Sequence, residues 1–106
     1  MSESPQGVVK LAELVTYQEG AVVSRTIVKN AAGSVTAFAF DEGQALSEHT
    51  AAFDALVQVL EGDVEIVVGG TAHRLADGEA ILMPANVPHA VNAVSQFKML
   101  LTMLKG

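Results

Sequence analysis

The 106-residue sequence contains no cysteine, so it can form neither a disulfide nor a cysteine-ligated zinc site. It has no apolar run near the ~18 residues that a membrane-spanning helix requires. The first seven residues, Met1–Gly7, show neither the positive end nor the apolar stretch of a signal peptide, and their polar character predicts a flexible leader. We therefore expect a cytoplasmic protein that has no membrane partner.

Basic residues are also scarce. Six lysines and arginines stand against 12 aspartates and glutamates, which gives a formal net charge of −6. The basic residues are scattered singly along the chain, whereas phosphate recognition needs them clustered. A nucleic-acid partner is therefore not expected.

The composition of the chain predicts a mainly aliphatic interior. Half of the residues are hydrophobic and only 5% are aromatic. A chain of this length suits one domain that buries roughly 65% of its unfolded surface. We expect residues 8–106 to form that single domain.

From residue 21 onward, short apolar and β-branched runs alternate with turn residues, which is typical of an all-β sandwich or barrel. The pair Gly69-Gly70 predicts a tight hairpin, because glycine adopts positive φ readily. Only Val8–Val15 has a helical stripe, and an edge strand would suit it equally. The absence of βαβ alternation favours a small antiparallel barrel. The expected strands are Ala21–Lys29, Ser34–Asp41, Ala55–Leu60, Val64–Val68, Thr71–Leu75, Ala80–Met83, His89–Val94 and Phe97–Leu104.

Two glycine-bounded segments carry histidines at fixed spacing. The first runs from Gly43 through His49 to Gly62, and the second runs from Gly78 to His89. They resemble the two motifs of the cupin superfamily, G-x5-H-x-H-x(3,4)-E-x6-G and G-x5-P-x-G-x2-H-x3-N. The resemblance covers about residues 34 to 104. It implies a double-stranded β-helix barrel of the jelly-roll type.

The chain keeps only part of the ligand set of that family. His49 and His89 match the first and last metal-ligand positions, whereas Ala51 and Ala55 stand where a second histidine and a glutamate would be. Asn86 replaces the glycine of the second motif. The resemblance therefore implies a divalent transition metal (Zn, Ni, Fe, Mn or Cu) held by two histidines, with solvent or substrate completing its coordination.

Strand alternation extends this reading to a pocket. If His49 points into the barrel, every second residue after it does too, and Asp54 points out, which makes that carboxylate a poor substitute for the missing glutamate. Methionine sulfur from Met83, Met99 or Met103 would favour a soft ion such as Cu(I), although methionine more commonly fills gaps in a core. Besides His49 and His89, the predicted pocket lining comprises Phe38, Phe40, Ala51, Phe53, Ala55, Met83, Val91, Phe97, Met99 and Leu101.

Two further charged or titratable residues stand out. His73 follows the Gly69-Gly70 turn and has no ligand role in the family pattern, so we interpret it as structural or exposed. Arg25 sits inside an apolar strand, where it would be a solvated edge residue, cap a pocket or cross a subunit interface.

Three kinds of function remain open from the sequence. One is a metal-dependent enzyme acting on a small polar substrate. Another is a metal-free protein that binds a small molecule in an apolar cavity. The third is a sensory or structural domain that acts by dimerising, and the resemblance implies a homodimer.

Overall fold

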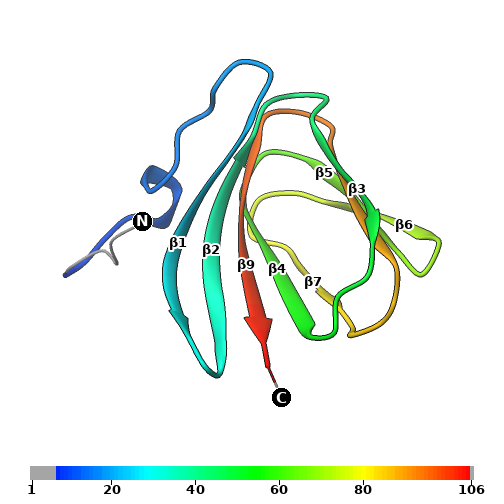
Figure 1. Ribbon diagram of the computed structural model, residues 1–106. Coiled ribbons are helices and arrows are strands. Elements are labelled where there is room, and N and C mark those ends of the chain that lie inside the picture. Colours follow the sequence, from blue (N-terminus) through cyan, green and yellow to red (C-terminus); the bar gives the residue numbers. More distant parts are fainter. Residues whose placement is uncertain (1–6, 106) are drawn as a thin grey trace.

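The computed structural model describes residues 7–105 (Figure 1). Of the flexible leader expected over residues 1–7, all but Gly7 lies outside the described residues. Within this range no helix is long and apolar enough to cross a membrane. The elements, in chain order, are η1 (Leu11–Glu13), β1 (Val22–Asn30), β2 (Gly33–Phe40), β3 (Ala45–His49), β4 (Asp54–Glu61), β5 (Val64–Val68), β6 (Thr71–Leu75), β7 (Ala80–Met83), β8 (His89–Ala93) and β9 (Phe97–Leu104).

The strands form two antiparallel sheets that pack face to face (Figure 1). The five-stranded sheet has the order β1-β2-β9-β4-β7, and the four-stranded sheet has the order β3-β8-β5-β6. This confirms the all-β, jelly-roll barrel predicted from the sequence.

Strand β2 shows how the sequence builds two apolar layers. Phe38 and Phe40 project into the barrel interior, while Ala37 and Ala39 project to the outer face of the same sheet. The alternation follows from the pleat of a strand, which sends successive side chains to opposite faces. The five-stranded sheet is consequently apolar on both faces, unlike a sheet that has one face exposed to solvent.

The segment before β1 covers part of that outer face. Leu14, Val15 and Tyr17 pack on it, and the Lys98 ammonium donates a hydrogen bond to the Ala12 carbonyl oxygen. The helix or edge strand expected over Val8–Val15 is wrong, because only the three-residue η1 forms there. A segment of eight residues is too short to be stable as an isolated helix, so its packing against the sheet determines its conformation.

The hairpin predicted at Gly69-Gly70 is confirmed. It joins β5 to β6, and both glycines have positive φ, 57° and 83°. Two consecutive positive φ values characterise the turn whose twist matches that of paired strands.

Gly62 occupies a tighter turn, between β4 and β5. Its φ is +91°, and a Cβ placed on it would lie 2.2 Å from the Gln96 carbonyl oxygen and 2.8 Å from the Phe97 Cα. Both of these atoms are backbone, so they cannot move aside as a flexible side chain would. This close approach fixes the β4–β5 turn against the start of β9.

We predict that Gly62→Ala destabilises the protein much more than Gly78→Ala does. Gly78 has a similar φ of +83° but no atom within 4 Å of a placed Cβ, so its substitution isolates the conformational cost, about 1–2 kcal/mol. Gly62→Ala should cost a further ~1–3 kcal/mol from the steric clash. Urea unfolding of the two variants measures the difference. Equal losses in stability would contradict the steric clash expected at residue 62.

Candidate functional site

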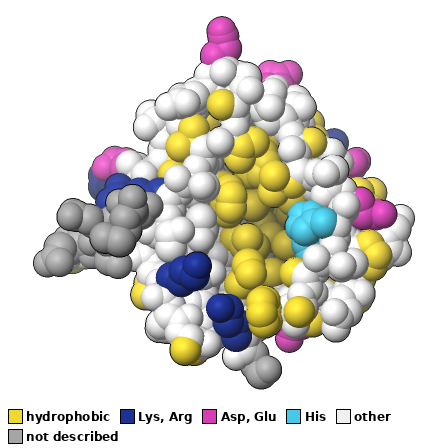
Figure 2. Space-filling view, in the orientation of Figure 1, with side chains coloured by type: hydrophobic (Ala, Val, Ile, Leu, Met, Phe, Trp, Pro, Cys, Tyr) yellow, Lys and Arg dark blue, Asp and Glu magenta, His cyan; other side chains and the backbone are white. Residues whose placement is uncertain are grey.

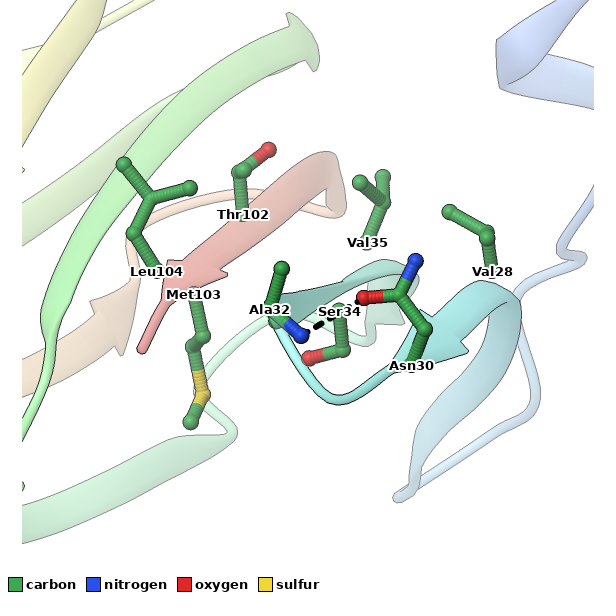
Figure 3. A pocket seen from close by; sticks show the side chains of 9 residues that line it. Val28, Asn30, Ala32, Ser34, Val35, Thr102, Met103 and Leu104 are labelled. Carbon is green, nitrogen blue, oxygen red and sulfur yellow. Dashed lines mark hydrogen bonds between the residues drawn. The ribbon is translucent and has the colours of Figure 1, made fainter. Parts of the chain in front are cut away.

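Two cavities are candidates for a binding site. The larger, about 180 Å³, is open to solvent at the tip of the β1–β2 hairpin. Figure 3 shows Val28, Val35 and Thr102 projecting to one side there, while the Met103 side chain points away from them. The part of the chain that the structure describes places no ionisable side chain in the lining of this cavity and so offers no group there for acid–base or metal chemistry.

The smaller cavity, about 60 Å³, lies in the barrel interior between the two sheets. Histidine side chains lie at the edge of an apolar hollow in the space-filling view (Figure 2). Among residues 7–105, the two imidazoles are the only titratable groups in its lining, which makes this cavity the candidate site. It is lined by Leu46, His49, Ala51, Ala55, Met83, His89, Val91, Met99, Leu101 and Met103.

Most of the predicted lining residues are brought together here. Both histidines, both alanines, Met83, Val91, Met99 and Leu101 border the cavity. Leu46 and Met103 also line it. Leu46 is absent from the sequence-based prediction, whereas Met103 is named there only as a possible sulfur donor. For Met103 a signal existed, since it shares a face of β9 with Met99 and Leu101.

The four predicted phenylalanines do not line the cavity. Phe40 and Phe97 stack with ring centroids 4.7 Å apart, and Phe38 packs against Phe40 at 6.0 Å, so the three fill another part of the interior. The Phe53 ring faces the Lys105 ammonium, which lies 5.6 Å from its centroid. Residues 50–52 lie between β3 and β4 outside any strand, and β4 begins only at Asp54. Strand alternation therefore does not carry through the segment that precedes Phe53.

Leu46 escapes the prediction because of an irregularity in β3. The β3–β8 pairing shifts register between Leu46 and His49, so both side chains reach the same cavity although the two residues are an odd number of positions apart. A bulge of this kind inserts an extra residue into one strand and reverses the alternation after it.

Strand pairing places the two histidines opposite each other. His49 ends β3 and His89 begins β8, and the two residues are paired in register. Their rings meet at 72° with centroids 4.4 Å apart, and their Nε2 atoms are separated by 3.1 Å. His89 is only 4% exposed, whereas His49 is exposed at the cavity rim. One imidazole of the pair is therefore fixed in the interior and the other is accessible from solvent.

The backbone fixes the proton on the other nitrogen of each ring. His49 Nδ1 lies 2.7 Å from the Ser47 carbonyl oxygen, and His89 Nδ1 lies 3.1 Å from the Val87 carbonyl oxygen. A carbonyl oxygen only accepts hydrogen bonds, so each Nδ1 must carry a proton and donate it. In the neutral rings both Nε2 atoms then present lone pairs to each other. A proton shared between these nitrogens would make the contact a hydrogen bond, and a metal ion between them would be held by both lone pairs.

Comparison with known proteins identifies the family. The family model described as a cupin domain matches residues 37–104. The chain belongs to the cupin superfamily.

Solved structures resemble the chain over most of its length. A conserved protein of unknown function from Streptococcus pyogenes is 35% identical, with a TM-score of 0.92, over 100% of this chain and 93% of that one. A cupin superfamily protein from Desulfitobacterium hafniense DCB-2 is 27% identical, with a TM-score of 0.91, over 97% and 95% of the two chains.

A Cupin 2 conserved barrel domain protein from Leptotrichia buccalis is 42% identical, with a TM-score of 0.85, over 89% of this chain and 46% of that one. None of the proteins with curated descriptions matches the chain. The comparisons therefore give the family and the fold without an activity.

The second cupin motif is held in place beside the first. The Asn86 N–H donates to the Ala51 carbonyl oxygen at 2.7 Å, and the Ala85 N–H donates to Asp54 Oδ1 at 2.8 Å. Asp54, which sequence alternation expected to point outward, is exposed. Its carboxylate supports the loop before His89 and is absent from the cavity lining.

Asn86 stands where the cupin motif has glycine, and its φ of 65° explains the exchange. Asparagine tolerates this left-handed conformation better than other residues with a side chain. We predict that Asn86→Gly leaves stability within about 0.5 kcal/mol, whereas Asn86→Ala costs roughly 1 kcal/mol. Thermal and urea unfolding would measure both. A glycine variant less stable than the alanine variant would contradict this account of the turn.

The remaining singled-out residues lie away from the cavity. His73 is exposed on β6, in agreement with one of its expected readings. Arg25 is half-buried on β1, the edge strand of its sheet, paired with Ala37. It does not line the cavity.

The donor set of the cavity differs from that of a complete cupin site. Within residues 7–105 no cluster of three or more histidine, aspartate, glutamate or cysteine side chains is placed to hold a metal. The histidine pair nevertheless fits one ion, because two bonds of about 2.1 Å that meet at close to a right angle span 3.1 Å. Donation of the second ring nitrogen to a backbone carbonyl is also the usual support for a metal-binding histidine.

Proposed function

We propose that this cupin binds a small molecule in the 60 Å³ cavity, at one transition-metal ion held by the Nε2 atoms of His49 and His89. The observation that carries the proposal is the convergence of two Nε2 lone pairs, each fixed by a backbone acceptor of the opposite ring nitrogen. The divalent ions Zn, Ni, Fe, Mn and Cu are the first candidates. Such an ion would polarise an oxygen of the ligand as a Lewis acid.

The cavity limits what the ligand can be. A volume of about 60 Å³ exceeds the space of a single water but is far below the ~300 Å³ of a pocket for a drug-sized molecule. The walls are aliphatic or thioether apart from the two imidazoles. These features favour a small molecule with one oxygen-bearing end and a short apolar body.

A metal-free pocket is the second candidate, because one proton shared between the Nε2 atoms would account for the same 3.1 Å contact. The pair would then carry a single positive charge and bind a carboxylate, an enol or a phenolic oxygen. Ligand-induced stabilisation that persists in the presence of a chelator would identify this case.

We predict that untagged protein reconstituted with Mn, Fe, Ni, Cu or Zn retains close to one ion per chain, and that His49→Ala and His89→Ala lose it. Loss of a ligand should weaken binding by more than the roughly 10- to 100-fold that loss of a ligand's own hydrogen-bond partner costs. Elemental analysis and metal titration measure both effects.

His73→Ala is the matched control, since it removes an exposed imidazole that lies outside the cavity. It should retain the metal. If wild-type protein binds none of the five ions, or binds them equally well in His49→Ala, the metal site is refuted and the metal-free pocket takes its place.

Restoring a carboxylate at residue 55 provides a gain-of-function test. Ala55 is 4% exposed, lines the cavity and occupies the glutamate position of the cupin motif. We predict that Ala55→Glu raises the affinity for Zn(II) or Ni(II) at least about 10-fold over Ala55→Gln, because only the former adds an anionic ligand. Isothermal titration calorimetry measures the metal affinity of both variants, whose substituted side chains are of the same size. Equal affinities would show that residue 55 does not face the ion.

A further inference from the structure

Three methionines line the same cavity as the histidine pair. Met83, Met99 and Met103 all border it, and they are all of the chain's methionines apart from Met1. Met83 and Met99 are 3% and 1% exposed. Every thioether in the described part of the chain therefore lies around two imidazoles whose Nε2 lone pairs converge.

The strand register places two of these methionines on either side of Ala55. Ala55 of β4 pairs with Met83 of β7 on one side and with Met103 of β9 on the other. Directly paired residues have Cβ atoms roughly 4.5–5.5 Å apart and project from the same face of the sheet. The small residue Ala55 thus occupies the glutamate position of the cupin motif. It is flanked by two long side chains, each of which carries a sulfur atom next to its terminal methyl group.

Core filling alone does not require sulfur at these positions. Leucine fills a similar volume and already lines the cavity at Leu46 and Leu101. Methionine differs from leucine in its flexibility and in its thioether, a soft donor. Exchange of methionine for leucine therefore separates packing from ligation.

The charge of the donor set selects among ions. None of the described residues that line the cavity carries a carboxylate, and imidazole and thioether are both neutral ligands. The Born cost of taking an ion from water rises with the square of its charge, so a divalent ion costs about four times as much as a monovalent one. Soft sulfur donors together with imidazole suit Cu(I). Neutral, soft ligands in an apolar cavity thus favour a monovalent copper ion over Zn(II), Ni(II) or Mn(II).

We propose that His49, His89 and at least one of Met83 and Met103 form a Cu(I)-binding site, in which thioether sulfur takes the place of the carboxylate at residue 55. This inference rests on the metal-binding histidine pair of the proposed function and specifies the ion that the pair selects.

The test uses the full chain under anaerobic conditions with ascorbate, and measures Cu(I) affinity by competition with bathocuproine disulfonate. We expect one Cu(I) per chain and a loss of affinity of at least about 10-fold in Met83→Leu/Met103→Leu. Binding of Zn(II) to the same double variant should change by less than about 2-fold, because zinc does not use thioether ligands. X-ray absorption of the copper-loaded wild type should show a sulfur shell that the double variant lacks.

Two controls accompany the double variant. His73→Ala removes an exposed imidazole that lies outside the cavity, so it should retain the Cu(I) affinity. The Zn(II) affinity of the double variant itself reports any change in packing around the histidines. Unchanged Cu(I) affinity in the double variant, or an equal loss of its Zn(II) and Cu(I) affinities, overturns the Cu(I) site.

The outcomes also separate this inference from the proposed function. One outcome is that divalent ions bind in a way that depends on His49, while Cu(I) affinity does not change when the methionines are replaced. This outcome would support the histidine site and refute the copper site. Failure to bind either kind of ion would refute both. Circular dichroism of each variant verifies that a lost affinity does not reflect unfolding.

Discussion

The register of β9 determines much of this molecule. It pairs with β2 on one side and with β4 on the other, so its backbone hydrogen bonds are made along both edges. Its alternating side chains supply Met99, Leu101 and Met103 to the cavity and Lys98 and Leu100 to the outer face. A slip of one residue would send the whole set to the opposite face and leave the interior without one wall.

The parts of the fold that the sequence predicts are those in which local chemistry agrees with the tertiary arrangement. The alternation of phenylalanine and alanine in β2 separates the two apolar layers, and the Gly69-Gly70 pair requires a turn whichever sheet receives it. The two motif segments are predictable for the same reason. Their glycines and Pro84 shape turns, and the position of Asn86 requires only tolerance of positive φ.

The errors come from features that no single strand encodes. Ala45–His49 was not expected as a strand, because it is short and mostly exposed and is defined by pairing with β8. The register shift within this strand brings Leu46 into the cavity. This shift is defined by the pairing with β8, so the sequence of the strand alone does not predict it. The phenylalanines were expected to line the pocket because they face inward, but an inward-facing side chain can fill the interior as well as border a cavity. Which of these occurs depends on volumes contributed by both sheets.

The geometry of the histidine pair does not depend on the two cupin ligand positions that alanine occupies. The orientation of each imidazole depends on a carbonyl two residues earlier in its own strand or loop, Ser47 for one ring and Val87 for the other. Neither support involves residue 51 or 55, so alanine at those positions leaves both Nε2 atoms converging. What the alanines change is the charge of the cavity, because the glutamate of the motif would have supplied its one anionic ligand. Position and charge are thus controlled by different residues: the backbone carbonyls orient the two imidazoles, and the residues at positions 51 and 55 set the charge of the cavity around them.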